Sequence, residues 1–451
     1  MAATKPSTLK GTRDLGPEMM LKRNFIFEVI KEVFKKFGFL QIETPSMEKL
    51  EVLTGKYGEE GDQLIFKVLN SGEKVKKADL EALKNEEYSK FATSVSEKAL
   101  RYDLTVPFAR FVAMNHMELA MPFKRFQIQP VWRADRPQKG RYQEFFQCDA
   151  DVVGTESLLC EAEVILMISE VFEKLKIEDY TIKINNRKIL TGLAEVLQCQ
   201  SQQSDLFVAI DKLDKLDLTT VLKGLKERNF SQIQMDVIEK FVSSESLDTI
   251  AELLTLSKEA QLGISEITEV KEILTQYGYD AKYLEYDPKL ARGLSYYTGC
   301  IFEVKINNVT MGSVSGGGRY NNLTEVFGLL NMPGIGFSFG VDRIFDVMEE
   351  LHLFPKFGSE STQVLITNFD QVCFNKSLPL LNKLREKNIK SELYPISDKI
   401  KKQFNYANKK GIAYVLVAGS DEFEKNCFIL KHMESGTQEE LSINQILEKL
   451  S

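Results

Sequence analysis

The spacing of apolar residues changes several times along the chain. Between residues 17 and 37, apolar side chains recur every three or four positions, which predicts an amphipathic helix. The runs 123–132 and 142–154 have the pattern of strands, and the charged loop between them predicts a β-hairpin with a long basic tip. An amphipathic helix over 157–177 and a strand over 180–186 are predicted next.

The pattern changes twice more before the chain ends. Strand signals disappear over 188–278, where mixed-charge helical segments predict an inserted helical module. Strand-like and glycine-rich segments return over 291–351. From residue 361 onward, β and α patterns alternate, which predicts a separate small α/β domain. The polar stretch 58–98 has no regular pattern, and we interpret it as a solvated helix or an insertion.

Composition narrows the class of protein without identifying it. The chain has 451 residues, 43% of them apolar, which suits a folded protein of several domains. The formal charge of −7 gives no global basic field, although the stretch 376–410 is locally rich in Lys and Arg. No stretch is apolar enough to span a bilayer and no signal peptide is recognisable, so we expect a cytoplasmic protein without a membrane partner. The six cysteines and three histidines lack metal-ligand or redox spacing, which predicts ordinary reduced thiols.

The predicted hairpin brings charged residues of both signs together. Arg133 and Arg141 lie at its tip, whereas Gln147, Asp149 and Asp151 share one face of its second strand. Carboxylates on a half-buried strand are costly unless a partner binds them. The arginines and this polar face could form one cavity for an anion beside a cationic group, such as an amino acid next to a nucleotide phosphate. A solvated sheet face with surface ion pairs explains the same residues about equally well.

Three further stretches combine glycine with arginine or aromatic residues. In "ARGLSYYTG", Arg292 precedes Tyr296 and Tyr297, whose adjacent side chains would point to opposite faces of a strand. In "GSVSGGGRYNNL", three glycines permit close approach of a ligand or of a neighbouring strand, and the P-loop pattern is absent. In "GIGFSFGVDRI", Arg343 lies in the first turn of a predicted helix. Arginine suits phosphate because its planar fork binds two oxygens, but core tyrosines and solvated arginines are the alternative.

These stretches, in this order, resemble the motifs of class II aminoacyl-tRNA synthetases, and specifically those of the histidyl-tRNA synthetase family. "RADRPQKGRYQEFFQCDAD" resembles motif 2, and "GIGFSFGVDRI" resembles motif 3. The helix 17–37 with the strand ending at Pro45 resembles motif 1, which forms the dimer interface. "ARGLSYYTG" resembles a signature of the histidine enzymes, and "GTRDLGP" and "KKQFNYANKKGIAYVLVAG" fit as well. The resemblance covers nearly the whole chain.

The resemblance implies both a fold and a set of ligands. It implies an α+β catalytic domain with an antiparallel sheet, in segments 1–187 and 279–358. It further implies a helical insertion over 188–278 that contacts the tRNA acceptor stem, and a C-terminal α/β anticodon-binding domain over 361–451. The ligands that follow are ATP, Mg²⁺, L-histidine and tRNA(His), and the expected assembly is a homodimer.

The resemblance also implies roles for single residues around ATP. Arg133 would bind the α-phosphate, Arg343 the far end of the triphosphate, and Arg141 a further phosphate. Arg292 would lie against the α-phosphate and the carboxylate of the amino acid, so Arg133 and Arg292 are the expected catalytic residues. Asp135, where the family often has glutamate, is the expected Mg²⁺ contact.

Each polar group of L-histidine likewise has an implied partner. Asp151 would accept the imidazole N–H, and Tyr297 would donate to the other ring nitrogen. A site with both an acceptor and a donor rejects isosteres that lack either one, because its own polar groups would be left unpaired. The expected histidine-binding residues are Asp103, Thr105, Arg133, Gln147, Asp151, Arg292, Tyr296 and Tyr297.

Two other interpretations stay open. A catalytically silent paralogue could act as a regulatory subunit or as a tRNA sensor, although regulatory paralogues usually lack the C-terminal domain and the arginine signature that this chain keeps. A nucleotide-binding scaffold without an RNA partner is the second, and the basic stretch 376–410 argues against it. The resemblance favours an enzyme that activates L-histidine with ATP and transfers it to tRNA(His).

Overall fold

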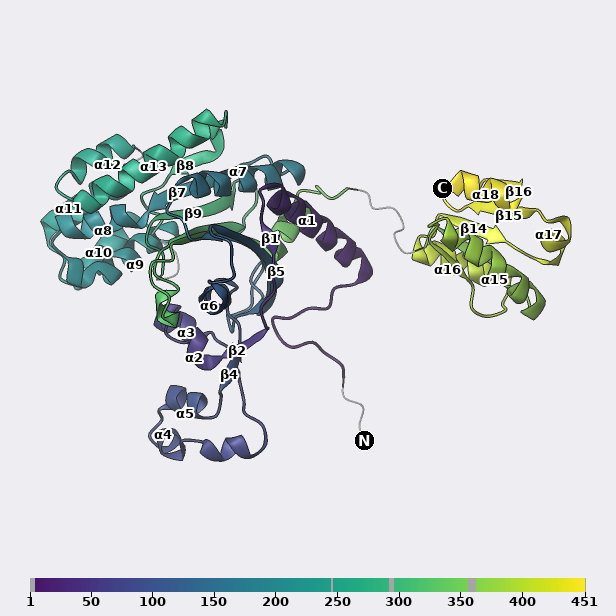
Figure 1. Cartoon of the computed structure of the whole chain (residues 1–451), viewed down its shortest axis with the longest axis horizontal. Helices are drawn as coiled ribbons and strands as arrows, with labels where there is room; N and C mark the ends of the chain where they lie inside the picture. The colour runs from purple at the N-terminus through teal and green to yellow at the C-terminus, as the bar shows by residue number, and fades with distance from the viewer. Residues whose placement is uncertain (1–4, 245, 292–295, 356–361, 451) are drawn as a thin grey trace. The chain divides into compact units, whose positions relative to one another are not determined.

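The computed structural model describes residues 5–244, 246–291, 296–355 and 362–450 (Figure 1). The chain divides into a large unit, Met1–Phe354, and a smaller one, Pro355–Ser451. Each unit has a hydrophobic core of its own, and each is described by itself.

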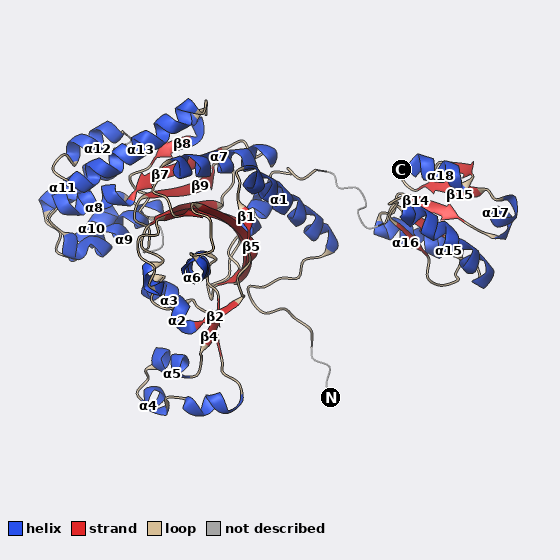
Figure 2. Cartoon of the chain, in the orientation of Figure 1, coloured by secondary structure: helices blue, strands red, loops and turns tan. Residues whose placement is uncertain are grey.

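An eight-stranded sheet forms the centre of the large unit (Figure 2). Its strands lie in the order β1-β5-β6-β11-β10-β9-β7-β8. Neighbours from β5 to β7 pair antiparallel, whereas the edge strands β1 and β8 pair parallel to β5 and β7. The strands are β1 (Leu40–Gln41), β5 (Phe123–Trp132), β6 (Glu144–Val153), β7 (Tyr180–Asn186), β8 (Leu284–Tyr286), β9 (Cys300–Ile306), β10 (Ser315–Tyr320) and β11 (Gly334–Gly340).

Strand β6 separates an apolar face of this sheet from a polar one. Its residues Cys148, Ala150 and Val152 join the core beneath helices α1 (Pro17–Lys36) and α7 (Leu159–Lys174). Because side chains alternate along a strand, Gln147, Asp149 and Asp151 lie on the opposite face. The predicted hairpin and its alternation are confirmed.

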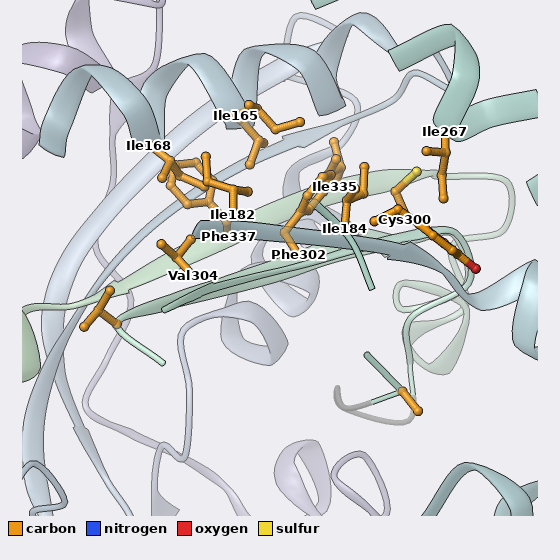
Figure 3. Close-up of a cluster of buried hydrophobic side chains, with 14 of the residues drawn as sticks. Ile165, Ile168, Ile182, Ile184, Ile267, Cys300, Phe302, Val304, Ile335 and Phe337 are labelled. Atoms are coloured by element: carbon orange, nitrogen blue, oxygen red, sulfur yellow. The ribbon is translucent and has the colours of Figure 1, made fainter. Parts of the chain in front are cut away.

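The core on the apolar face joins strands β7, β9 and β11 to helices α7 and α13 (Lys258–Gln276), as Figure 3 shows. The labelled side chains are Ile165, Ile168, Ile182, Ile184, Ile267, Cys300, Phe302, Val304, Ile335 and Phe337. All six cysteines are free thiols and five of them are buried, as the sequence predicted. Apolar burial of this extent, at about 25 cal/mol per Å², supplies the main driving force for folding.

The polar face of the sheet is covered by helix α6 (Thr105–Asn115), which has a separate apolar cluster around Val106, Phe108 and Val112. Beside it lies a small sheet in the order β2-β4-β3. The stretch 58–98, interpreted from the sequence as a solvated helix or an insertion, folds into short helices that connect strands of this small sheet. The strands of the small sheet and the helices near them are β2 (Met47–Lys49), α2 (Leu50–Leu53), α3 (Gly58–Gln63), β3 (Lys67–Val68), α4 (Leu80–Lys84), α5 (Tyr88–Ser94) and β4 (Lys98–Leu100).

Between β7 and β8, the residues that the structure describes are helical apart from the connections. Helix α8 packs closely against α13, and both lie beside the sheet (Figure 1). Across the residues described, no helix is long and apolar enough to cross a lipid bilayer. The helices of this segment are α8 (Arg187–Val196), α9 (Gln203–Asp211), α10 (Leu218–Glu227), α11 (Gln232–Val242), α12 (Leu247–Leu253) and α13.

The small unit is a five-stranded mixed sheet in the order β13-β12-β14-β15-β16. Helices α15 (Gln371–Glu386) and α18 (Ile443–Leu450) share its main core, whereas α16 (Ile400–Lys410) packs in a second cluster with Leu365 and Val415. The strands are β12 (Val364–Ile366), β13 (Ser391–Leu393), β14 (Tyr414–Val417), β15 (Phe428–His432) and β16 (Gln438–Leu441). The sequence did not predict β16 or the short helix α17 (Ser420–Lys425), because neither carries an apolar pattern.

A buried ion pair ties α7 to β10. Arg319 donates from Nε to Glu161 Oε1 at 2.5 Å and from Nη2 to Oε2 at 2.6 Å, and neither side chain is appreciably exposed. Two further N–H groups of Arg319 reach the carbonyl oxygens of Thr155 and Ser157. A buried charge satisfied in this way becomes strongly destabilising once its partner is removed.

We therefore expect Glu161→Ala to lower the free energy of unfolding of the large unit by roughly 3–5 kcal/mol. Urea unfolding followed by the fluorescence of Trp132, the one tryptophan in the chain, measures this directly. The control is Asp205→Ala, which breaks the exposed pair with Arg228 and should cost less than about 1 kcal/mol. Equal effects of the two substitutions would contradict the structural role of the buried pair.

Candidate active site

Two adjoining cavities lie on the polar face of β6. The first, here called the arginine cavity, has a volume of about 250 Å³ and is bounded by the hairpin tip, the start of β10 and the start of helix α14 (Val341–Glu350). Its charged lining residues are Arg133, Asp135, Arg141, Asp342 and Arg343. Arg133 and Arg141 of the hairpin tip and Arg343 of a separate stretch, all three predicted from the sequence, therefore face one cavity.

Arg133 follows the end of β5 and is held by contacts that leave its charge intact. Its Nε donates to the carbonyl oxygen of Tyr102 at 3.1 Å. Its guanidinium carbon lies 4.3 Å from the centroid of the Tyr102 ring and 5.2 Å from that of Phe145. Aromatic faces attract a cation without neutralising it, so the side chain is oriented while it still presents a full positive charge.

Arg343 lies in the first turn of α14, as predicted, and is also held by backbone oxygens. Its Nε donates to the carbonyl of Gly140 at 2.9 Å, and its Nη1 donates to that of Ser313 at 2.5 Å. The first contact reaches the hairpin tip and the second reaches the segment before β10. Arg343 thus joins two walls of the arginine cavity.

Arg13, which the sequence reasoning did not assign, connects the N-terminal segment to this region. Its Nη2 donates to Asp342 Oδ1 at 2.5 Å, and its guanidinium lies 4.0 Å from the centroid of the Tyr142 ring. The other oxygen of Asp342 accepts from the backbone N–H of Phe146 at 3.0 Å. These contacts fix the start of α14 against β6. The "GTRDLGP" stretch was the available signal, since it contains Arg13.

Asp135 and Arg141 form an ion pair in the wall of the arginine cavity. Arg141 Nη2 lies 2.9 Å from Asp135 Oδ1, and Asp135 is largely buried. Within the described ranges, no group of three or more His, Cys, Asp or Glu side chains could hold a metal ion. Asp135 can therefore offer a cation only a single carboxylate, with the remaining ligands coming from elsewhere.

Arg292 and Ser295 lie outside the residues that the structure describes. The role expected of Arg292 rests on the sequence alone. Leu290 and Ala291, which precede it, are buried, and the carbonyl of Ala291 accepts from Arg187 Nη1 at 2.9 Å.

The second cavity, here called the acidic cavity, has a volume of about 150 Å³. It shares Arg133, Gln147, Gly316 and Ser338 with the arginine cavity, so the two adjoin. Apart from Arg292, every residue expected to bind histidine lines it. These residues are Asp103, Thr105, Arg133, Gln147, Asp151, Tyr296 and Tyr297.

Asp103 precedes helix α6 and has one engaged oxygen and one open one. Its Oδ1 accepts from the hydroxyl of Tyr57 at 2.9 Å and from the backbone N–H of Val106 at 3.2 Å. Its Oδ2 is buried and has no hydrogen-bond partner. Burial raises the pKa of Asp103, against the hydrogen bond from Val106 and the charge of Arg133. An open carboxylate oxygen of this kind is suited to a ligand ammonium group.

Asp151 lies on β6 above a buried cation. Arg125 Nη2 lies 2.8 Å from Asp151 Oδ2, and the hydroxyl of Tyr320 donates to Asp151 Oδ1 at 2.5 Å. Arg125 is fully buried, with its guanidinium 4.2 Å from the centroid of the Phe108 ring. Burial raises the pKa of Asp151, while Arg125 and Tyr320 act in the opposite direction. Arg125 and Tyr320 were not predicted, because the register that pairs Arg125 with Asp151 is seen only in the structure.

Gln147, Ser338 and Asp149 form a polar chain along the wall of the acidic cavity. Gln147 Nε2 donates to the hydroxyl oxygen of Ser338 at 3.1 Å, and the Ser338 side chain hydrogen-bonds to Asp149. Gln147 Oε1 and Asp149 Oδ1 are both buried without a partner. Burial raises the pKa of Asp149 to about 7, although the charge of Arg125 opposes the shift.

The prediction that Tyr296 and Tyr297 would serve different faces is wrong. Both line the acidic cavity, with ring centroids 4.9 Å apart. They precede β9 and lie outside any strand, so the alternation of side chains does not apply to them. Burial raises the pKa of both hydroxyls, which therefore remain protonated donors near neutral pH.

Two glycines leave room for the groups of the acidic cavity. A Cβ on Gly336 would lie 2.0 Å from Asp151 Oδ1, and a Cβ on Gly318 would lie 2.6 Å from the carbonyl of Cys300 and 3.0 Å from the Tyr297 ring. The triple glycine of β10 thus permits close approach of both a neighbouring strand and a cavity residue. The close contact with a neighbouring strand is confirmed, whereas the approach of a ligand stays a prediction.

Comparison with known proteins agrees with the geometry. The family model described as histidyl-tRNA synthetase matches residues 81–344, and that of the anticodon binding domain matches 363–451. A protein of Cytophaga hutchinsonii named histidine–tRNA ligase is 53% identical over 451 residues, covering 99% of each chain. One of Christiangramia forsetii with the same name is 51% identical and covers 98% of each. The crystal structure of histidyl-tRNA synthetase from Nostoc sp. PCC 7120 is 29% identical, with a TM-score of 0.81 and 99% of each chain covered.

The fold is that of a class II aminoacyl-tRNA synthetase, with a large antiparallel-rich sheet and a C-terminal unit that has its own sheet, as predicted. The chain belongs to the histidyl-tRNA synthetase family. The relatives named as ligases do not favour a silent regulatory paralogue.

We expect Gly336→Ala to displace the Asp151 carboxylate and to raise the KM for histidine roughly tenfold or more, since a polar group of the site loses its geometry. The KM for ATP should change little, because Gly336 lines only the acidic cavity. Pyrophosphate–ATP exchange measures both constants. The matched control is Gly224→Ala in α10, where a Cβ meets open space. An unchanged KM for histidine would show that Asp151 is not needed at its observed position.

Proposed function

We propose that the two adjoining cavities activate L-histidine with ATP to form histidyl-adenylate, and that the chain then transfers the histidyl group to tRNA(His). The observation that carries this proposal is the convergence of Arg133, Arg141 and Arg343 on one cavity beside a donor- and acceptor-lined pocket. Membership of the histidyl-tRNA synthetase family supports the choice of histidine and of tRNA.

The arginine cavity is proposed to hold ATP. In the first step the histidine carboxylate attacks the α-phosphorus and pyrophosphate leaves, so negative charge builds on the phosphoryl oxygens. Preorganised cations stabilise such charge most effectively, because they need no reorganisation during the reaction. Arg133 would bind the α-phosphate, Arg343 the far end of the triphosphate, and Arg141 a further phosphate. Arg292 is proposed to lie between the α-phosphate and the histidine carboxylate, as a second catalytic arginine.

Asp135 is the proposed contact for Mg²⁺. A single carboxylate fits this ion, which usually retains waters and completes its shell with substrate phosphates. When bound, Mg²⁺ would neutralise charge on the phosphoryl oxygens. Asp135 is ion-paired with Arg141, so the same substrate phosphate that draws Arg141 away would free an oxygen of Asp135 for the ion.

The acidic cavity is proposed to hold histidine. The open oxygens of Asp103 and Gln147, with the hydroxyl of Thr105, would hold the α-amino group. Asp151 would accept the imidazole N–H and Tyr297 would donate to the other ring nitrogen, which matches the one donor and one acceptor of a neutral imidazole. Tyr296 supports the same segment through its contact with the Tyr297 ring.

The remaining parts of the chain are proposed to bind tRNA and a second copy of the chain. The catalytic segments 1–187 and 279–358 would act with the helical segment 188–278 on the acceptor stem, while 361–451 would bind the anticodon. The motif 1 region ends in the edge strand β1, where Leu40 is 63% exposed, and we propose that it forms the interface of a homodimer. We propose that the protein acts in the cytoplasm and without a membrane partner.

Offering each of the twenty amino acids separately in pyrophosphate–ATP exchange tests the central proposal. We expect exchange with histidine only, because the acidic cavity pairs a carboxylate acceptor with tyrosine donors. In the same assay Arg292→Ala should lower the rate at least about a hundredfold, the loss typical of removing one preorganised donor. No exchange with histidine in the unmodified chain would reject the proposal, and a near-normal rate in the variant would remove Arg292 from catalysis.

The small unit provides a test of tRNA binding. Ten Lys and Arg residues between 376 and 410 are all exposed. Lys383→Ala, Lys387→Ala and Lys390→Ala together should weaken tRNA binding and lower the slope of log K against log salt by roughly 2, since each lost phosphate contact removes about 0.7–0.9. Histidine-dependent exchange should not change. Unaltered salt dependence would place the tRNA contact elsewhere.

A further inference from the structure

The polar face of β6 carries one carboxylate that the proposed function leaves unused. Asp149 lies between Gln147 and Asp151 on this strand and lines the acidic cavity with them. It is 2% exposed, and its Oδ1 has no hydrogen-bond partner. Burying a carboxylate oxygen without a partner costs free energy. A buried oxygen of this kind therefore implies a hydrogen-bond donor on a ligand or another function that offsets this cost.

The neighbours of Asp149 do not satisfy it. On β6, the charge of Asp151 repels that of Asp149. Arg125 and Gln127 of β5 lie on one side of Asp149, and Ser338 of β11 lies on the other. Asp149 also interacts electrostatically with Asp103, Tyr297 and Arg101. Arg125 is already within 2.8 Å of Asp151, and Gln127 donates to Thr44 and Gln129. One guanidinium therefore serves two carboxylates.

We propose that Asp149 is a specificity-determining residue of the amino-acid site, and that its open oxygen shares the one N–H of the neutral imidazole with Asp151 in a three-centre hydrogen bond. The inference rests on the proposed function, since it names a further contact of the same cavity.

The position along the strand supports this contact. Residues two apart on a strand are about 6.6 Å apart. Gln147, at one end of this row, borders both cavities and Asp151 borders only the acidic one, so Asp149 lies beside the middle of a ligand that extends from the α-amino end to the far end of the ring. Asp149 Oδ1 and Asp151 Oδ2 are both buried without a hydrogen-bond partner, so each carboxylate keeps one oxygen for the ring, although Arg125 Nη2 lies 2.8 Å from the Asp151 oxygen.

The proposal has a pH signature. Only the ionised carboxylate provides a charged acceptor, and burial raises the pKa of Asp149 to about 7. Histidine binding through Asp149 is therefore fully available above that pKa and is lost as the pH falls through it. Protonation of the free histidine ring also changes binding in this range, but it affects every variant equally and cancels in a ratio.

The experiment compares kcat/KM for histidine in pyrophosphate–ATP exchange between the unmodified full-length chain and Asp149→Asn, from about pH 6 to about pH 8. We expect the ratio of unmodified to variant to be roughly tenfold at the upper end, because a charged acceptor becomes a neutral one, and to approach one at the lower end. The KM for ATP should stay within about twofold. Glu266→Gln, which neutralises a carboxylate bound to Lys188 and Asn186 in the helical segment, is the matched control.

The outcomes separate this inference from the proposed function. A ratio that is constant over the pH range, or one near unity throughout, would overturn the role of Asp149 while leaving histidine activation intact. No histidine-dependent exchange in the unmodified chain would reject the proposed function itself. Binding of histidine by isothermal titration to Asp149→Asn supplies the second measurement: an affinity equal to that of the unmodified chain at about pH 8 would likewise overturn the proposal.

Discussion

The two-residue period of β6 is the constraint on which the rest of the site depends. One face of this strand packs into the core beneath α1 and α7, so it cannot shift by one residue without burying three polar side chains there. The buried pair between Arg125 and Asp151 fixes the register of the hairpin from the other face. With the register fixed, Gln147, Asp149 and Asp151 face one cavity, and the hairpin tip brings Arg133 to its entrance.

Sequence pattern predicted most of the fold because most elements follow a simple period. The strands over 123–132 and 180–186 were predicted with the bounds of β5 and β7, since their apolar residues mark a buried face. The pattern failed where burial is slight: β16 is an exposed edge strand, and helices α4 and α5 in the stretch 58–98 bury only Ala82 between them. Because so few residues of these elements are buried, their sequence has no apolar period from which they could be predicted.

The sequence predicted most residues of the candidate site, but it could not predict the contacts between them. Arg133, Arg141 and Arg343 could be named from glycine-rich and charged stretches, and the structure places them around one cavity. Arg125 could not, because its importance comes from a cross-strand partner 26 residues away in sequence, and a single strand does not state its register. Tyr296 and Tyr297 were misjudged because they lie in a loop before β9, where backbone dihedrals rather than alternation set the direction of a side chain.

The wall shared by the two cavities has a thermodynamic consequence. Arg133 and Gln147 border both cavities. A ligand that reorients these side chains in one cavity therefore changes the affinity of the other cavity for its own ligand. Linkage requires the effect to be mutual: the factor by which nucleotide alters the dissociation constant of the amino acid equals the factor by which the amino acid alters that of the nucleotide. Two sites that share a guanidinium are therefore coupled to the extent that a ligand in one of them changes the position of that guanidinium.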